Sequence, residues 1–101
     1  MFHDLTPETF DEEVLHTEGP VLLDYWAEWC FPCRMLTPTL KKVAAERPDI
    51  KICTVDIDEQ PEITAKLGIM SIPTLIAYRG GKPIDQFSGI LSRRTILSMF
   101  K

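Results

Sequence analysis

The run from Val21 to Ala27 constrains the fold of this 101-residue chain more than any other segment. It reads Val-Leu-Leu-Asp-Tyr-Trp-Ala and is apolar on both faces, apart from Asp24. Strands buried on both faces of a parallel sheet have this composition, because helices cover such sheets on both sides. The run therefore predicts an α/β fold with a central sheet.

The rest of the chain supplies the helices and strands that such a sheet needs. Helical patterns cover residues 7–16, 31–47 and 61–67, and Ser92 is a candidate N-cap of a last helix. Strand patterns cover residues 50–57, 74–79 and 84–88, the last two joined as a hairpin through Gly80-Gly81-Lys82-Pro83. Pro38 lies inside the second helix and is expected to kink it. The order predicts a mixed sheet with helices on both faces.

Composition fits a single ordinary domain over residues 1–101. Hydrophobic residues make up 45% and charged residues 26%, and no stretch is long and apolar enough to span a bilayer, so we expect no membrane partner. The net charge of −4 disfavours nucleic-acid binding, and Arg93-Arg94 is expected on a solvated helix face. The first residues lack the basic and apolar regions of a signal peptide, which favours the cytoplasm. A solvated acidic face is expected from Glu8, Asp11, Glu12 and Glu13.

The chain has three cysteines, and two of them form the motif Cys30-Phe31-Pro32-Cys33. A small secreted scaffold would carry a denser and even set. A tetrahedral zinc site needs four ligands, so a metal or cluster site on Cys30 and Cys33, with or without Cys53, is the weaker alternative. Cys53 is expected to be a small buried strand residue.

The Cys30–Cys33 motif leaves a buried strand and enters a helix, which is where α/β proteins place their sites. A thiolate at a helix N-terminus is favoured by free N–H groups, so the pKa of Cys30 should fall below its ordinary value of about 8.5. Cys33 lies one turn further on, on the same face, and is expected to be the more buried thiol. The pair predicts disulfide exchange in which Cys30 attacks a substrate disulfide and Cys33 resolves the mixed disulfide, with no cofactor or metal.

Two further features accompany the cysteines. Desolvation should raise the pKa of Asp24, which could then take the Cys33 proton during resolution; a structural aspartate bonded to local backbone is the alternative. Ile72-Pro73-Thr74 starts a strand, where a cis Ile72–Pro73 bond and an ordinary trans bond are about equally supported. In either case the backbone at Ile72 could pair with an extended substrate.

Together these segments resemble the thioredoxin family, over nearly the whole chain. The matching features are the run from Val21 to Met35, Pro38, Val55-Asp56-Ile57-Asp58, Gly68-Ile69, Ser71-Ile72-Pro73-Thr74, Gly80-Gly81-Lys82 and Ser88-Gly89. The resemblance implies a thioredoxin fold, with a central five-stranded mixed sheet flanked by four helices.

The resemblance also implies an activity, partners and site residues. The activity is that of a protein-disulfide reductase, recycled by a thioredoxin reductase of unknown type and acting on disulfide-bearing client proteins, and we expect a monomer. Cys30 would be the nucleophile, Cys33 the resolving cysteine and Asp24 the buried carboxylate, with a cis bond before Pro73. Substrate would dock on a surface formed by Trp29, Phe31, Pro32, Ile72, Pro73, Gly89 and Ile90.

Three positions depart from the family's pattern. Phe31 replaces the usual glycine and enlarges the apolar rim. Thr54 stands where many relatives have a buried lysine, which should leave the pKa of Asp24 higher than in those relatives. Met70 stands where some relatives have arginine. A more oxidising or client-dedicated exchanger, and a non-catalytic binding subunit with the same fold, are the competing interpretations.

Overall fold

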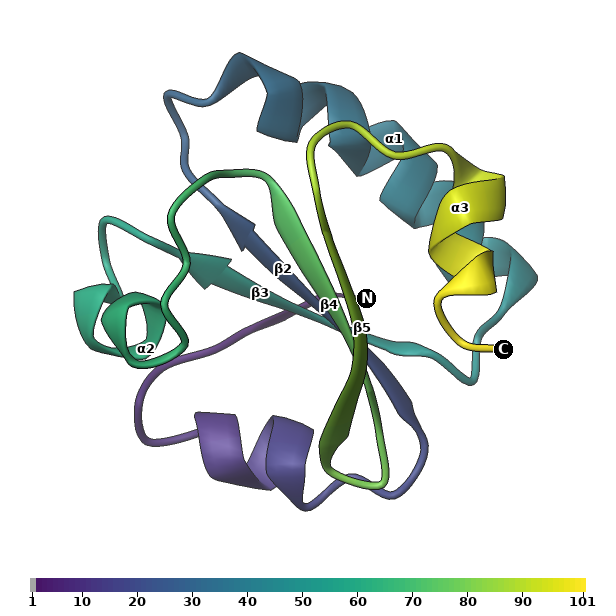
Figure 1. The fold of residues 1–101 in the computed structure, drawn as a ribbon, viewed down its shortest axis with the longest axis horizontal. Helices are drawn as coiled ribbons and strands as arrows, with labels where there is room; N and C mark the ends of the chain where they lie inside the picture. The colour runs from purple at the N-terminus through teal and green to yellow at the C-terminus, as the bar shows by residue number, and fades with distance from the viewer. Residues whose placement is uncertain (1) are drawn as a thin grey trace.

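The computed structural model describes residues 2–101 as a five-stranded sheet with helices on both faces (Figure 1). The elements in chain order are β1 (His3–Asp4), η1 (Asp11–Leu15), β2 (Pro20–Trp26), α1 (Phe31–Glu46), β3 (Lys51–Asp56), α2 (Pro61–Lys66), β4 (Thr74–Arg79), β5 (Lys82–Ser88) and α3 (Arg93–Ser98). The strand order is β1-β3-β2-β4-β5. Strands β1, β3 and β2 are parallel to one another. Strand β4 is antiparallel to β2, and β5 is antiparallel to β4. The predicted fold class is confirmed.

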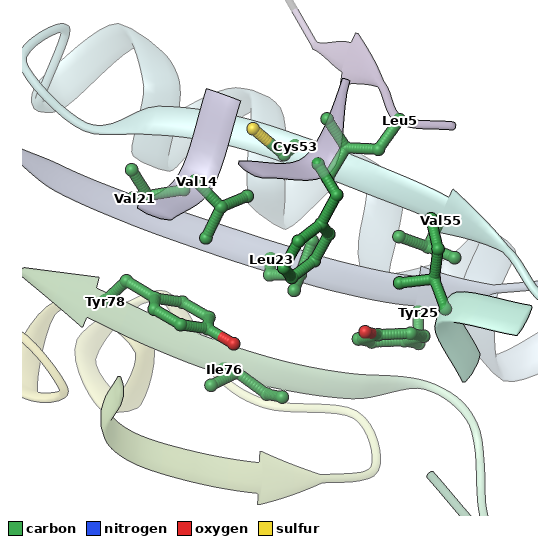
Figure 2. Close-up of a cluster of buried hydrophobic side chains, with 11 residues drawn as sticks. Leu5, Val14, Val21, Leu23, Tyr25, Cys53, Val55, Ile76 and Tyr78 are labelled. Carbon is green, nitrogen blue, oxygen red and sulfur yellow. The ribbon is translucent and has the colours of Figure 1, made fainter. Parts of the chain in front are cut away.

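Helices α1 and α3 lie on one side of the sheet, and η1 and α2 lie on the other (Figure 1). Alternate residues of each strand point to opposite faces, so the two faces have separate cores. The core on the η1 side includes Val14, Leu23, Tyr25, Cys53 and Val55, and Figure 2 shows these side chains packed together. The core on the α1 side includes Leu22, Leu36, Leu40, Leu75 and Ile96. No helix within residues 2–101 is long and apolar enough to cross a membrane.

Most predicted elements are confirmed to within three residues at each end, but the N-terminal region differs. Strand β1 was not predicted from the residue pattern, since its two residues are too few to show a period. They become a strand by pairing with Cys53 and Thr54 of β3. The helix expected over residues 7–16 is a turn followed by η1, a wider π-type helix in which the His16 N–H donates to the Asp11 carbonyl at 2.9 Å.

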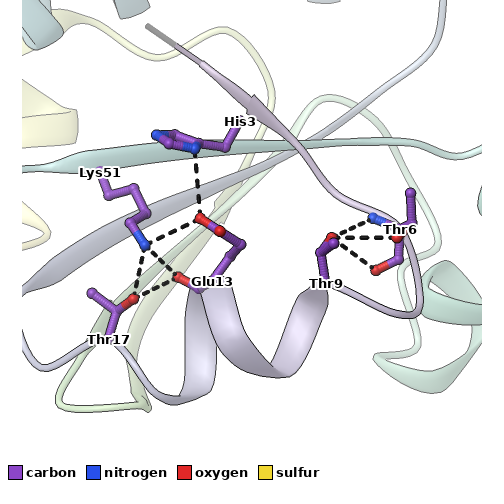
Figure 3. A network of polar contacts seen from close by, with 6 residues as sticks. All are labelled: His3, Thr6, Thr9, Glu13, Thr17 and Lys51. Atoms are coloured by element: carbon purple, nitrogen blue, oxygen red, sulfur yellow. Dashed lines mark hydrogen bonds and ion pairs between the residues drawn. The ribbon is translucent and has the colours of Figure 1, made fainter.

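The expectation of a fully solvated acidic face on this helix is wrong for Glu13. Glu13 is half-buried, and its carboxylate lies 3.2 Å from Lys51 Nζ and 3.5 Å from His3 Nδ1. The same ammonium group donates to the Glu13 carbonyl and to the Thr17 hydroxyl (Figure 3). Lys51 thereby links η1 to β3.

The hairpin between β4 and β5 is shorter than the predicted four-residue connection. Arg79 pairs directly with Lys82, which leaves Gly80 and Gly81 as a two-residue turn. Both glycines have positive φ, +61° and +78°, as the tight turns favoured by twisted hairpins require. Gly81 also lies against the carbonyl group of Leu15, where a side chain would not fit.

Candidate active site

The candidate site begins where β2 ends and α1 starts. Cys30 is the N-cap of α1, and Phe31 and Pro32 occupy its first turn, which suits proline because that position needs no donor. Cys30 and Cys33 form a disulfide with their Cα atoms 5.3 Å apart. The backbone N–H of Cys33 donates to Sγ of Cys30 at 3.2 Å. The Cys30 sulfur therefore accepts from one of the free N–H groups of the helix terminus.

The prediction that Cys33 is the more buried cysteine is wrong in this oxidised structure. Cys30 is 4% exposed and Cys33 is 6% exposed. The disulfide joins both sulfurs into one small cluster with Ala27, against which Trp26, Ile57 and Ile72 pack. Cys30 is buried together with Cys33 because both belong to this cluster.

Asp24 lies in the middle of β2, on the face covered by α1, and Cys33 borders the same cavity of about 160 Å³. The carboxyl group is buried, and its Oδ1 has no hydrogen-bond partner among the described residues. Desolvation raises the pKa of Asp24 from 3.8 to about 7, which confirms the predicted direction. An aspartate held by local backbone hydrogen bonds, the structural alternative, does not fit an unpartnered Oδ1.

Thr54 does not replace the buried lysine of related proteins as a partner of Asp24. The two residues pair across β2 and β3, but the Thr54 hydroxyl donates its hydrogen to Asp4 of β1. Asp4 lines the same cavity, so two carboxyl groups border it. Sequence reasoning missed Asp4, because only the pairing of β1 with β3 brings it there.

The loop before β4 lies beside the disulfide. The Ile72–Pro73 bond is cis, which confirms the expectation from the resemblance. Ile72 packs against the cysteine cluster, and the Gly89 N–H donates to the Pro73 carbonyl at 2.8 Å. This hydrogen bond brings Gly89, and Ile90 after it, next to the proline.

Exposed apolar side chains surround this loop. Trp29 is 68%, Phe31 67% and Met70 97% exposed, and Ile90 is also exposed. Trp29, Met70 and Ile72 line a cavity of about 300 Å³. The indole N–H of Trp29 donates to Asp58 Oδ2 at 2.7 Å, a contact that sequence reasoning missed because 29 residues separate the two. The predicted docking residues therefore lie on the cysteine motif and on the two loops next to it.

Cys53 lies apart from the cysteine pair. It belongs to the core on the η1 side of the sheet, whereas Asp24 and Cys33 lie on the α1 side. Burial raises the pKa of the Cys53 thiol to about 12. Within residues 2–101, no three histidine, cysteine or acidic side chains are grouped so that they could hold a metal ion.

A dithiol/disulfide pair at a helix N-terminus, above a buried carboxyl group and beside a cis-proline loop, defines a thiol–disulfide oxidoreductase. Comparison with known proteins agrees, since the sequence profile of the thioredoxin family matches residues 1–101. Thioredoxin from Rickettsia bellii is 41% identical over 98 residues, which are 96% of this chain and 93% of that protein. Thioredoxin from Streptomyces clavuligerus is 42% identical over 94 residues, covering 93% and 88%. Thioredoxin 1 from a Nostoc species is 41% identical over 93 residues, covering 91% and 87%. The chain belongs to the thioredoxin family.

Proposed function

We propose that this oxidoreductase reduces protein disulfides, with Cys30 as the attacking and Cys33 as the resolving cysteine. The hydrogen bond from the Cys33 N–H to the Cys30 sulfur carries the assignment. A backbone donor aimed at one sulfur of the pair favours the thiolate on that sulfur. Cys30 also borders the exposed apolar side chains, whereas Cys33 borders the Asp24 cavity.

The reaction then proceeds in two exchanges. The Cys30 thiolate attacks one sulfur of the substrate disulfide; a Cys30–substrate disulfide forms, and the other substrate sulfur leaves as a thiolate. The Cys33 thiol passes its proton to the ionised Asp24 carboxylate, and the Cys33 sulfur attacks Cys30. The Cys30–Cys33 disulfide forms, and the second substrate sulfur leaves. Two electrons have moved to the substrate, and a reductase must return them.

The role of Asp24 follows from its burial. A proton acceptor works best when its pKa is close to the working pH, and burial raises the pKa of Asp24 to about 7. The carboxyl group can thus take the Cys33 proton and release it again at neutral pH. The proposed positions are consistent with this transfer, since both groups line one cavity.

Client proteins would dock on the surface formed by Trp29, Phe31, Pro32, Ile72, Pro73, Gly89 and Ile90. Ile72 lies just before β4, where an extended peptide can add main-chain hydrogen bonds next to the sulfurs. We further propose a monomer acting in the cytoplasm, where a glutathione- and reductase-maintained dithiol can cycle. A thioredoxin reductase would supply the electrons.

A client-dedicated exchanger is the second candidate, and Phe31 favours it. Phe31 is 67% exposed and follows Cys30 in the chain, so a large client protein that reaches Cys30 would contact it. A redox titration against glutathione, together with rates on several client disulfides, separates a general reductase from a dedicated or more oxidising one.

Trapping with Cys33→Ser tests the proposed function. This variant should retain client proteins as mixed disulfides on Cys30, and reduction should release them. Cys30→Ser is the matched control and should retain none, although Cys53 is still present. If Cys33→Ser traps nothing from a cell extract, or if Cys30→Ser keeps the biological activity, the reductase proposal is wrong.

A further inference from the structure

The cavity below Cys33 holds a second carboxyl group that the exchange reaction described above does not use. Asp4 from β1 and Asp24 from β2 both line it, together with Thr54 from β3. Asp4 is exposed, and Asp24 is buried. Among residues 2–101, no lysine, arginine or histidine belongs to the cavity wall, so neither carboxyl group has a cationic partner from that part of the chain there.

Strand register fixes the three side chains in one row. Asp4 pairs with Thr54 across β1 and β3, and Thr54 pairs with Asp24 across β3 and β2. Residues paired in this way lie on the same face, with neighbouring strands about 4.8 Å apart. The Leu5 N–H donates to the Thr54 carbonyl at 2.8 Å and holds β1 in this register. Thr54 therefore lies between the two aspartates.

The direction of the Thr54 hydrogen bond determines whether the Thr54 hydroxyl presents a donor or an acceptor to Asp24. A threonine hydroxyl has one hydrogen and two lone pairs, and Thr54 donates its hydrogen to Asp4 Oδ1. Towards Asp24 the hydroxyl oxygen can then only accept. A protonated carboxyl group can donate to it directly, whereas a carboxylate has no hydrogen to donate.

We propose that Asp4 is a positioning residue for the proton transfer at Cys33. By accepting the Thr54 hydrogen, it turns the hydroxyl into an acceptor that favours the protonated form of Asp24. This inference rests on the proposed role of Asp24 as the proton acceptor. It adds that Asp4 and Thr54 together determine the pH range in which Asp24 is protonated.

The other polar and ionisable groups in and near the cavity do not take part in the row of Asp4, Thr54 and Asp24. Cys33 of α1 also lines the cavity, but its sulfur is held in the disulfide and does not titrate in the oxidised protein. The Thr37 hydroxyl donates to the Cys33 carbonyl at 3.3 Å. Glu28, Asp56 and Glu59 line a neighbouring cavity that shares Asp4 and Thr54. These carboxyl groups can act on Asp24 only through space, and they are unchanged in the variants below.

The test is an NMR titration of the Asp24 side-chain carboxyl in the oxidised protein. Asp4→Ala frees the Thr54 hydrogen to donate to the Asp24 carboxylate, so the pKa of Asp24 should fall by roughly half a unit to one unit. Asp4→Asn removes the charge but keeps an oxygen that can accept, so it should shift the pKa by less than half as much. In a Thr54→Val background, Asp4→Ala should have no such effect. Glu8→Gln, a charge change on an exposed residue, is the control.

Three results would overturn the proposal: no shift in Asp4→Ala, equal shifts in Asp4→Ala and Asp4→Asn, or a shift in the Thr54→Val background as large as in the protein that keeps Thr54. If Asp4→Ala does not fold, Thr54→Ser and Thr54→Val decide, since only the valine variant should lower the pKa of Asp24. The titration needs no substrate, so its outcome is independent of whether disulfide reduction is the function. In active protein, the pH profile of reduction should shift by the same amount.

Discussion

The backbone N–H of Cys33 donates a hydrogen bond of 3.2 Å to the sulfur of Cys30. Cys30 also caps the 16-residue helix α1, whose first N–H groups have no partner within the helix. Both features favour negative charge on the same sulfur. The two cysteines of the motif are therefore chemically unequal, although both are buried in the oxidised protein.

Alkylation of the reduced protein should show this inequality. At neutral pH, iodoacetamide should modify Cys30 first and leave Cys53 untouched, because burial raises the pKa of the Cys53 thiol to about 12. Peptide mass mapping after short exposure measures the order. Cys53→Ala should react at the wild-type rate; early modification of Cys53 or Cys33 would contradict the expected order.

Asp24 should make the protein less stable as the pH rises. The folded protein keeps a proton on Asp24 up to a pKa of about 7, whereas the unfolded chain releases it near 3.8. The free energy of unfolding therefore has its full value below about pH 4, falls as the pH rises to about 7, and is level above that. The total change is at most about 4 kcal/mol.

Asp24→Asn should remove this dependence, since asparagine does not titrate. The free energy of unfolding of the variant should match that of the wild type within about 1 kcal/mol at pH 4. At pH 8 it should exceed the wild-type value by roughly 2–4 kcal/mol. Urea unfolding of the oxidised proteins across this range measures the difference. Asp11→Asn, at an exposed position, should keep the wild-type pH dependence. A wild-type profile in Asp24→Asn would show that Asp24 ionises normally.

Phe31 should determine which disulfides react fastest. In Phe31→Gly, kcat/KM should fall about fivefold to tenfold for a peptide disulfide flanked by apolar residues, because aromatic anchors contribute most at such surfaces. Oxidised glutathione, which is small and polar, should not share this loss. The ratio of the two rates is the useful measurement, since a change in redox potential would affect both. Ile84→Ala, an exposed apolar position on β5, is the control; an unchanged ratio in Phe31→Gly would exclude Phe31 from docking.

Gly81 should tolerate no side chain. A Cβ there would lie 2.2 Å from the Leu15 carbonyl oxygen, and φ is +78°. Gly81→Ala should lower the free energy of unfolding by about 3 kcal/mol or more. A Cβ at Gly80 would face open space, and φ there is +61°. Gly80→Ala should therefore lower the free energy of unfolding by only about 1 kcal/mol, the cost of the left-handed conformation. Urea unfolding compares the two; equal losses would mean that the turn moves away from Leu15.

The longer elements could be predicted from the sequence because each one repeats its pattern over several residues. The apolar run of β2 and the helical spacing of α1 are examples, and β4 has the predicted bounds. The Cys30–Cys33 pair and Asp24 were found for a related reason: all three lie on one continuous stretch of chain.

Features that depend on pairing between distant segments could not be predicted. The strand β1 exists only through its contact with β3, and Asp4 reaches the cavity by the same contact. The hydrogen bond from Trp29 to Asp58 joins two loops that only the sheet brings together. The relative burial of Cys30 and Cys33 was predicted wrongly because helix position does not include the covering side chains Ile57 and Ile72.

The short strand β1 also matters for anyone who attaches this protein to a surface. Phe2 and Asp4 form part of the wall around Asp24, so a tag or resin joined ahead of Phe2 would be tethered beside that buried carboxyl group. Lys101 is exposed beyond α3, at the end marked C in Figure 1. Sensors and affinity columns built on this chain should therefore be coupled through its carboxyl end.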